Sequence, residues 1–280
     1  STCRRGKSVQ EAVIRKLPST FVDKIWGVDR LPAPFPHPSQ NRIGEVWFAP
    51  PDELDELLVK YIFTSERLSV QAHPDDRQAQ GMGLGSKGKS ECWVILDAEP
   101  GATIAVGFRD EITPEEMRAS ALDGTIVDKL VWHEVREGDV FYIPAGTVHA
   151  IGGGVSLIEI QQNSDITFRL FDYGRPRDLH LDQAVEVATT GPYPEQLRTR
   201  MGNDAGLLVD GPHFRLHYWR AQGSGPLPKL GQAPSLLIPF SGEVSFEGET
   251  LGAGDCALAS AIHDKSISGD GLLLIAQARY

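Results

Sequence analysis

Two polar side chains that can bind metal ions stand two residues apart in the segment RLSVQAHPDD, residues 67–76. The segment alternates apolar and polar residues as a half-buried β-strand does, so Gln71 and His73 share one face with Ser69. Such a face usually meets solvent, but it can also line a binding site. An amide oxygen and an imidazole nitrogen on the same face are donors that suit a divalent metal ion.

A further histidine ends a motif rich in turn residues. Residues 138–149 read GDVFYIPAGTVH, a G-x5-P-x-G-x2-H pattern that resembles the second motif of cupin barrels. In that motif the glycines and the proline make a tight turn between strands, and the histidine faces the barrel interior. The chain departs from the motif at Gly153, where cupins usually have asparagine. The resemblance implies a cupin barrel with a metal ligand at His149.

The cupin resemblance also implies where the other ligands lie. Cupin metal sites combine one histidine of the second motif with ligands from two strands of the first, which points to Gln71 and His73, Glu91 on the next strand, and His149. This mixed nitrogen and oxygen set suits Zn²⁺ and would also take Mn²⁺, Co²⁺ or Fe²⁺. We expect one ion per chain. The remaining histidines are expected to be ordinary surface or core residues: His37, His133, His180, His213, His217 and His263.

Longer segments resemble type I mannose-6-phosphate isomerases of the short bacterial form. In the order found in that family, they are DKIWGVDRL, IGEVWFAP, LSVQAHPDD, GKSECWVIL and IPAGTVHAIGGGVSLIEIQQNSDITFRLFDYGR. They run from about Lys24 to Arg175, and past residue 180 only a general likeness to cupins remains. The resemblance implies the same four metal ligands. It also implies that Arg169 and the acid Asp165 lie beside the sugar and that Glu159 belongs to the pocket wall. The phosphate end of the substrate would lie at Ser69 and Lys89.

The implied reaction moves a proton between C2 and C1 of an opened hexose phosphate through a cis-enediol. A divalent ion can act as a Lewis acid on the two oxygens, and the permanently charged Arg169 can stabilise or hold them. The reaction also needs a base active near neutral pH, for which Glu159, Asp165 and a metal-bound water are the candidates. Phe168 stands where the family usually has tyrosine, which removes a hydroxyl group from this region.

The elements that must position these residues are mostly strands. Short strands separated by glycine-containing turns predict a mostly β protein with two cupin barrels and a small helical insertion. The pattern restarts near residue 195 without ligand residues. We therefore expect a catalytic metal-binding domain in residues 1–190 and a degenerate C-terminal cupin in residues 191–280.

Two helices and one loop are predicted near the site. The clearest helix lies within residues 113–124, with Thr113 as N-cap and Gly124 as its stop. A shorter helix is expected within residues 179–189. The segment 75–89 is expected to be a loop, and its glycine-rich part, residues 77–88, is expected to be able to act as a lid.

Composition limits the partners of the chain. Its 280 residues are 41% hydrophobic and 23% charged, which is ordinary for a globular protein. The net charge of −11 argues against nucleic acid, but it leaves room for a small anionic substrate in a local cationic pocket. The three cysteines form no CxxC pair, and no apolar run has the length of a membrane span or the form of a signal core. We therefore expect a cytoplasmic protein, and the family resemblance implies that its partner is a small sugar phosphate.

Two other functions are compatible with a cupin barrel. A metal-dependent cupin oxygenase would use Fe²⁺ held by two histidines and one carboxylate, and both the fourth ligand Gln71 and the phosphate-side Lys89 argue against it. A non-catalytic sugar-phosphate-binding cupin would tolerate the loss of a ligand or of Arg169, yet all of these residues are present.

Overall fold

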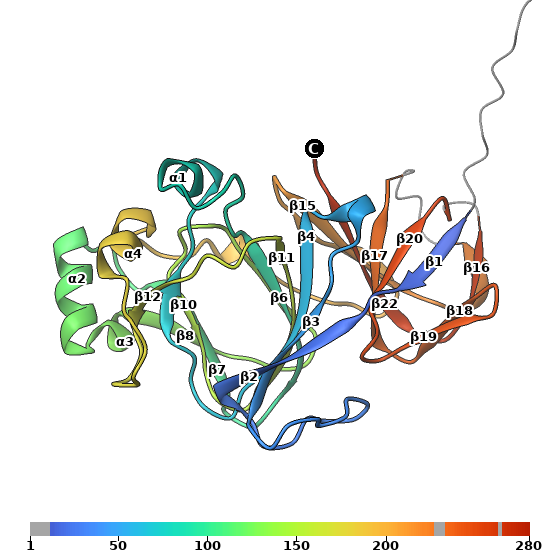
Figure 1. Cartoon of the computed structure of the whole chain (residues 1–280), viewed down its shortest axis with the longest axis horizontal. Coiled ribbons are helices and arrows are strands. Elements are labelled where there is room, and N and C mark those ends of the chain that lie inside the picture. Colours follow the sequence, from blue (N-terminus) through green and yellow to red (C-terminus); the bar gives the residue numbers. More distant parts are fainter. Residues whose placement is uncertain (1–11, 227–232, 263–264) are drawn as a thin grey trace, which may run out of the picture.

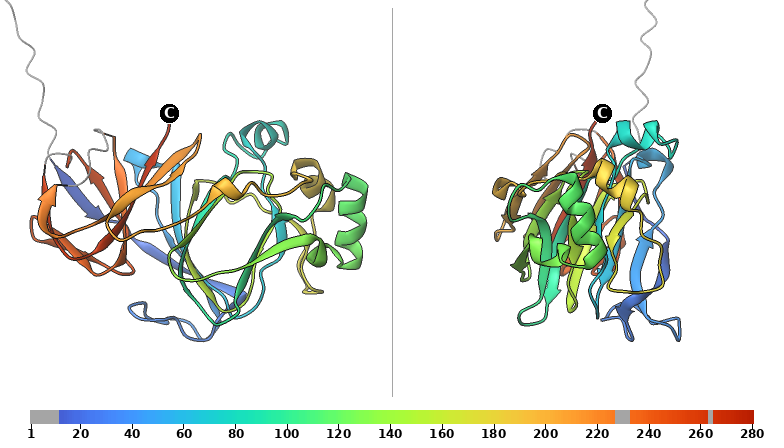
Figure 2. Two further views of the ribbon diagram at one scale, coloured as in Figure 1. Left: turned by 180° about the vertical axis from the view of Figure 1, so that it is seen from behind. Right: turned by 90° about the vertical axis from the view of Figure 1, so that its left-hand side faces the viewer.

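Antiparallel sheets make up most of the chain. The computed structural model describes residues 12–226, 233–262 and 265–280, which leaves Cys3 and His263 outside the described residues. Four antiparallel sheets form two lobes, and the α-helices lie on the larger lobe (Figure 1, Figure 2). The fold is mostly β, as the sequence predicts.

The larger lobe contains two sheets that face each other. The seven-stranded sheet consists, in spatial order, of β13 (Arg198–Arg200), β9 (Asp139–Ile143), β6 (Glu91–Ala98), β11 (Val155–Gln162), β4 (Leu57–Phe63), β3 (Ile43–Phe48) and β2 (Ser19–Val28). The five-stranded sheet consists of β12 (Phe168–Phe171), β5 (Val70–Ala72), β10 (His149–Ile151), β7 (Thr103–Phe108) and β8 (Leu130–Glu134).

The smaller lobe also contains two sheets. The six-stranded sheet consists of β1 (Val13–Lys16), β20 (Ala257–Ser260), β17 (Ser235–Ser241), β22 (Leu272–Ala278), β15 (Phe214–Arg220) and β14 (Ala205–Asp210). The four-stranded sheet consists of β16 (Gly223–Pro226), β21 (Ser266–Gly269), β18 (Glu243–Phe246) and β19 (Glu249–Gly252).

Each lobe includes one short strand from the other end of the chain. Strand β1 pairs with β20, with Val13 opposite Ser260, so the beginning of the described chain completes the C-terminal sheet (Figure 1). Strand β13 pairs with β9 of the larger lobe, with Arg198 opposite Phe141. The two lobes are therefore joined by strand pairing as well as by packing.

Apolar side chains fill the space between successive layers. Val59 and Ile160 of the seven-stranded sheet belong to one buried cluster with Leu236 and Leu274 of the six-stranded sheet. The inward face of the seven-stranded sheet and the five-stranded sheet share a second cluster that includes Ile95. This packing holds the strands that carry the polar site residues in fixed register.

Three helices cover the outer face of the five-stranded sheet: α2 (Pro114–Asp123), α3 (Ile126–Lys129) and α4 (Leu181–Val187). Both predicted helices, α2 and α4, are thus confirmed. Helix α2 begins with a capping box in which Thr113 Oγ1 accepts from the Glu116 amide at 3.1 Å and Glu116 Oε2 accepts from the Thr113 amide at 2.7 Å. It ends at Gly124, whose φ of 85° favours glycine.

The prediction of a continuous loop over residues 75–89 is wrong, because helix α1 (Asp76–Gly81) lies within it. Asp75 Oδ1 accepts from the Gln78 amide at 2.8 Å, and Gln78 Oε1 accepts from the Asp75 amide at 2.9 Å. This second capping box stabilises a short helix that the following glycines do not favour. Two 3₁₀ turns complete the elements: η1 (Asp52–Leu54) and η2 (Glu195–Leu197). Among the described residues, no helix combines the length and the apolar character needed to span a membrane.

Candidate active site

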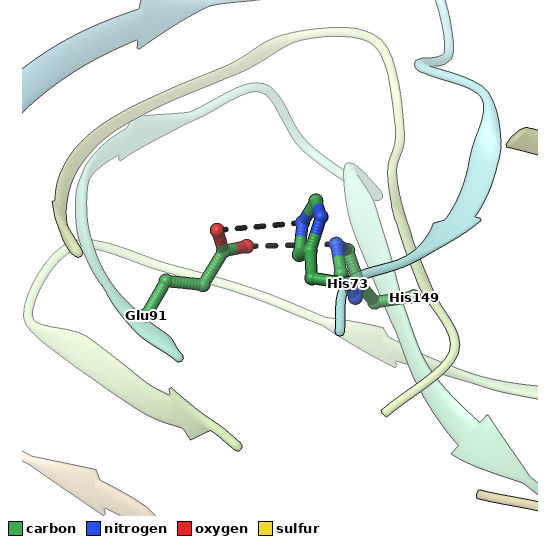
Figure 3. A group of neighbouring side chains, drawn as sticks. All are labelled: His73, Glu91 and His149. Atoms are coloured by element: carbon green, nitrogen blue, oxygen red, sulfur yellow. Dashed lines mark ion pairs between the residues drawn. The ribbon is translucent and has the colours of Figure 1, made fainter. Parts of the chain in front are cut away.

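Three of the four predicted metal ligands meet between the two sheets of the larger lobe. His73, Glu91 and His149 bring one ligand atom each to within 4.8 Å of one another (Figure 3). Glu91 Oε2 lies 3.5 Å from His73 Nε2, and Glu91 Oε1 lies 3.5 Å from His149 Nε2. All three side chains are buried. Strand β6 thus presents a carboxylate to two imidazoles on the opposite sheet.

Hydrogen bonds fix the proton on the outer nitrogen of both imidazoles. His73 Nδ1 donates to the Ile166 carbonyl at 2.8 Å, and His149 Nδ1 donates to the Thr147 carbonyl at 2.8 Å. Because a carbonyl only accepts, each neutral ring keeps a lone pair on Nε2, which faces Glu91. Burial lowers the pKa of His149 to about 3, and burial together with the Lys89 ammonium lowers the pKa of His73. Both rings are therefore neutral at pH 7, as metal ligands must be.

The Glu91 carboxylate is charged and incompletely bonded. Although burial alone would raise its pKa, the Lys89 ammonium and the His73 ring hold the pKa of Glu91 well below its usual value. Lys89 Nζ lies 3.0 Å from Glu91 Oε2, yet both carboxylate oxygens are buried without a hydrogen-bond partner. A buried ionised carboxylate without hydrogen bonds is costly unless another group compensates it. Two imidazole lone pairs and a charged carboxylate, paired with Lys89 on one oxygen, are directed at one point and fit a divalent cation.

The fourth predicted ligand, Gln71, lies next to this cluster. Its Nε2 is 3.4 Å from His149 Nε2, and its Oε1 accepts from the Ser69 hydroxyl at 3.1 Å. Rotation of the amide by 180° exchanges the two atoms, which brings the oxygen to the cluster and turns the amide donor toward the Ser69 oxygen. The position of Gln71 therefore fits an amide-oxygen ligand.

Arg169 stands in line with two of these residues across three neighbouring strands. In the five-stranded sheet, Gln71 lies opposite His149 on one side and opposite Arg169 on the other. Directly opposite residues project from the same face of a sheet. Burial and the positive charge of Arg177 lower the pKa of Arg169, and Arg169 Nε is buried without a hydrogen-bond partner. The guanidinium thus has unused donors beside the cluster.

A cavity of about 230 Å³ opens beside the cluster and is mostly polar in its lining residues. The seven-stranded sheet contributes Lys24, Trp26, Glu45, Lys60, Ile62, Trp93 and Glu159. The opposite wall contributes Ser69, Gln71, Thr167 and Arg169, followed by Arg177 and His180 of the segment after β12. Such a lining suits a small, charged and hydroxyl-rich ligand.

Comparison with known proteins points to one family of enzymes. No family model matches the chain. The chain is 37% identical over 198 residues to mannose-6-phosphate isomerase ManA of Bacillus subtilis, a match covering 65% of this chain and 60% of that relative. It is 33% identical over 267 residues to the mannose-6-phosphate isomerase of Streptococcus mutans, covering 79% of this chain and 83% of the relative. The chain belongs to the mannose-6-phosphate isomerase family. The crystal structure of the Bacillus subtilis mannose 6-phosphate isomerase superposes with a TM-score of 0.79 at 25% identity, covering 94% of this chain and 99% of that one.

Of the predicted acids, Glu159 lies deepest in the pocket of this mannose-6-phosphate isomerase family member. Its Oε2 accepts from the Trp93 indole at 3.0 Å, and its Oε1 lies 3.8 Å from Lys60 Nζ. Burial and the negative charge of Glu91 raise the pKa of Glu159 to about 7. Asp165, by contrast, is 65% exposed and lies 3.6 Å from Lys60 Nζ at the mouth of the pocket. The geometry therefore favours Glu159 over Asp165 as a base.

The two residues that the family resemblance associates with phosphate lie at the metal end of the pocket. Lys89 is buried, with its ammonium 3.0 Å from Glu91 Oε2 and 3.2 Å from His73 Nε2. Glu91 and Glu159 raise the pKa of Lys89 although burial opposes them. Ser69 donates its hydroxyl proton to Gln71. No contact tests the phosphate-binding role of either residue, so that role stays a prediction.

Several lining residues were not predicted from the sequence. Trp93 had the features of a core residue, and it is buried, but its indole contacts Glu159. Lys60 lies in the apolar strand β4 and was not predicted. A single lysine within an otherwise apolar strand could have indicated a residue of a buried polar site. His180 was expected to have an ordinary role, and Arg177 had no motif around it. Both lie in the pocket wall because the chain turns back along β12.

Proposed function

We propose that the chain is a metal-dependent aldose–ketose isomerase that interconverts mannose 6-phosphate and fructose 6-phosphate through a cis-enediol. The observation that carries this proposal is the buried Glu91 between two neutral histidines, with a second buried carboxylate, Glu159, in the same pocket. Glu91 and the two histidines suit a metal ion, and the Glu159 carboxylate suits proton transfer. Membership of the family gives the substrate class.

The proposed cofactor is one Zn²⁺ ion per chain, held by Gln71, His73, Glu91 and His149. Imidazole nitrogens with carboxylate and amide oxygens are compatible with Zn²⁺, and with Mn²⁺, Co²⁺ or Fe²⁺ as replacements. When bound, the ion supplies Lewis-acid polarisation of the substrate oxygens at C1 and C2.

Glu159 is the proposed base. As a carboxylate it removes the proton from C2 of the opened aldose, and as the acid so formed it returns the proton to C1 of the enediol. The hydroxyl proton of O2 passes to O1 in the same interconversion, so the atoms balance. A pKa of about 7 leaves a large fraction of the carboxylate ionised at neutral pH and still makes it an effective proton acceptor. The Trp93 indole and the Lys60 ammonium hold the carboxylate in place.

Two cations would stabilise the negative charge that develops on the sugar oxygens. Arg169 has unused donors beside Gln71 and is proposed to hold the oxygens of the reacting end. The Lys89 ammonium lies 3.2 Å from His73 Nε2 and adds positive charge beside the proposed metal ligands. Asp165 is a weaker candidate for the base because it is exposed at the mouth.

We further propose the two-cupin arrangement, with a catalytic domain in residues 1–190 and a degenerate cupin in residues 191–280. The pairing of two sheets in each lobe supports it. The boundary at residue 190 is not strict in space, because β1 of the first part pairs with β20 and β13 of the second part pairs with β9. A cytoplasmic location stays a prediction.

A coupled assay of fructose 6-phosphate formation from mannose 6-phosphate tests the function. We expect turnover by the metal-loaded protein, loss of turnover with a chelator, and recovery on adding Zn²⁺. The variants His149→Ala and Arg169→Ala should be impaired, while His217→Ala, a histidine of the smaller lobe, should match wild type. Absence of turnover by the metal-loaded wild type would remove the isomerase assignment in favour of a sugar-phosphate-binding cupin.

A further inference from the structure

A row of directly paired residues crosses four strands of the seven-stranded sheet and includes the proposed base. Trp47 of β3 lies opposite Lys60 of β4. Lys60 lies opposite Glu159 of β11, which in turn lies opposite Trp93 of β6. These four strands are neighbours in the sheet (Figure 1). Directly opposite residues project from the same face of a sheet, so Glu159 has an indole donor on one side and an ammonium group on the other.

The Lys60 ammonium is buried between two carboxylates and one indole ring. Its Nζ lies 3.8 Å from Glu159 Oε1 and 3.6 Å from Asp165 Oδ1, and both distances are longer than a hydrogen bond. The same Nζ lies 3.9 Å from the centroid of the Trp47 ring. A cation this close to an indole face is attracted by the ring, and more strongly where water is excluded. The Trp47 face is therefore a main support of this ammonium.

A third carboxylate, that of Glu45, fixes the orientation of the Trp47 ring. Trp47 Nε1 donates to Glu45 Oε2 at 2.6 Å, and Lys24 Nζ lies 3.3 Å from the same oxygen. Within the described residues, Glu45 and Lys60 line the cavity but Trp47 does not. Trp47 therefore acts on a bound ligand only through the side chains that it holds.

The position of the ammonium matters because Lys60 stands between a buried acid and an exposed one. Glu159 is buried, whereas Asp165 is 65% exposed at the mouth of the pocket. A lysine side chain is flexible and its ammonium is strongly hydrated, so without a fixed support it would follow the exposed carboxylate toward solvent. Glu159 would then keep the Trp93 donor but lose this cation.

We propose that Trp47 is a positioning residue of the isomerase reaction: the face of its indole ring holds the Lys60 ammonium beside Glu159 instead of at the mouth beside Asp165. This proposal rests on the proposed function, and it names a residue outside the cavity that supports the base. The held ammonium favours the ionised carboxylate, which is the form that accepts the C2 proton.

Other charges also act on Glu159. Burial and the negative charges of Glu91 and Glu45 raise the pKa of Glu159. The ammonium groups of Lys89 and Lys60 lower it. When the Lys60 ammonium moves away, one of the two stabilising cations is lost, so the titration of Glu159 shifts to higher pH.

Substitutions of two tryptophans test the proposal. Trp47→Leu removes the ring face, whereas Trp47→Phe keeps an aromatic face and removes only the indole donor to Glu45. Trp132→Leu is the matched control, because Trp132 is also half-buried and its ring centroid lies 5.4 Å from the Arg67 guanidinium carbon. Steady-state kinetics with mannose 6-phosphate and NMR titration of ¹³C-labelled glutamate carboxyl groups are measured on each variant, with thermal unfolding as a check of folding. The signal of Glu159 is assigned by its absence in Glu159→Gln.

We expect kcat to fall about 5- to 30-fold in Trp47→Leu with little change in KM, as for loss of a cation–π contact in a desolvated site. The titration midpoint of Glu159 should rise in the same variant. Trp47→Phe should stay closer to wild type than Trp47→Leu, and Trp132→Leu should match wild type. An unchanged midpoint in Trp47→Leu, or an equal loss of kcat in Trp47→Phe or Trp132→Leu, would overturn the proposal.

A double variant separates this role from packing alone. In the Lys60→Met background, adding Trp47→Leu should lower kcat no further, because the ammonium that the ring holds is already gone. Additive losses from the two substitutions would overturn the proposal. If wild type shows no turnover, the proposed function fails, but the NMR titration of Glu159 in Trp47→Leu still decides whether Trp47 holds Lys60 beside it.

Discussion

The indole nitrogen of Trp93 donates a hydrogen bond of 3.0 Å to the Glu159 carboxylate from the neighbouring strand. Both side chains are buried, so the bond is not weakened by solvent. A donated hydrogen bond stabilises the charged form of a carboxylate, whereas burial and Glu91 favour the protonated form. The balance between these effects sets the pH range in which Glu159 can accept a proton.

The substitution Trp93→Phe is expected to move the acid limb of the pH–activity profile. In wild type, kcat/KM should fall as the pH drops below about 7, because Glu159 becomes protonated. Loss of the indole donor raises the pKa of Glu159 further, so the midpoint should shift to higher pH. Trp47→Phe is the matched control, since Trp47 donates instead to Glu45. An equal shift in both variants would contradict the role given to the Trp93 bond.

The substitution Glu159→Gln is expected to lower kcat by about 10²- to 10⁴-fold, the usual contribution of a general base. KM and metal content should change little, because Gln is similar in size and Glu159 is not a proposed ligand. Asp165→Asn, which alters the exposed acid at the mouth, should have a small effect. A larger loss in Asp165→Asn than in Glu159→Gln would transfer the role of base to Asp165.

The substitution Glu91→Gln is expected to abolish stoichiometric metal binding, because it removes the one charged member of the ligand set. Elemental analysis after dialysis should find about one ion per chain in wild type and little in the variant. Bound metal at about 100 times its dissociation constant adds about 2.7 kcal/mol to stability. A chelator should therefore lower the Tm of wild type but not that of Glu91→Gln.

Glu45→Gln controls for this change at a buried glutamate of the same pocket. It should retain the metal ion and the response of the Tm to the chelator. Full metal content in Glu91→Gln would show that the cluster in Figure 3 is not the binding site.

The substitution Phe214→Ala is expected to destabilise both lobes together. Phe214 is fully buried and packs edge-on against Tyr142, with ring centroids 5.9 Å apart, so it joins the six-stranded sheet to the seven-stranded one. Removing it should lower the free energy of unfolding by about 3–5 kcal/mol. Leu207→Ala, at a side chain that is 50% exposed on the same sheet, should cost no more than about 0.5 kcal/mol. Denaturant unfolding followed by two probes measures both values.

The sequence predicted the parts of the site that local pattern determines. Alternation in the strand of Gln71 and His73 placed these residues on one face, and the turn motif before His149 placed it inside the sheet pair. A capping residue and a glycine stop set the limits of α2. In each case the signal lies within about ten residues, where backbone geometry decides the outcome.

The remaining parts depend on contacts between distant segments. Trp93 has the features of a core aromatic, and only the strand pairing of β6 with β11 brings it to Glu159. Arg177 and His180 reach the pocket because the chain folds back on Arg169. No spacing of residues in the sequence predicts this reversal. Helix α1 was missed because a capping box outweighed a glycine-rich composition.

The pairing of Val13 with Ser260 has a consequence for how the protein is made on the ribosome. Strand β1 is synthesised before its partner β20, and all the strands of both sheets of the larger lobe lie between them in the sequence. Until β20 has been synthesised, β1 has no partner edge, and the six-stranded sheet cannot close. Completion of the six-stranded sheet must therefore wait for the synthesis of β20 and β22, even though the strands of the larger lobe are by then available to pair.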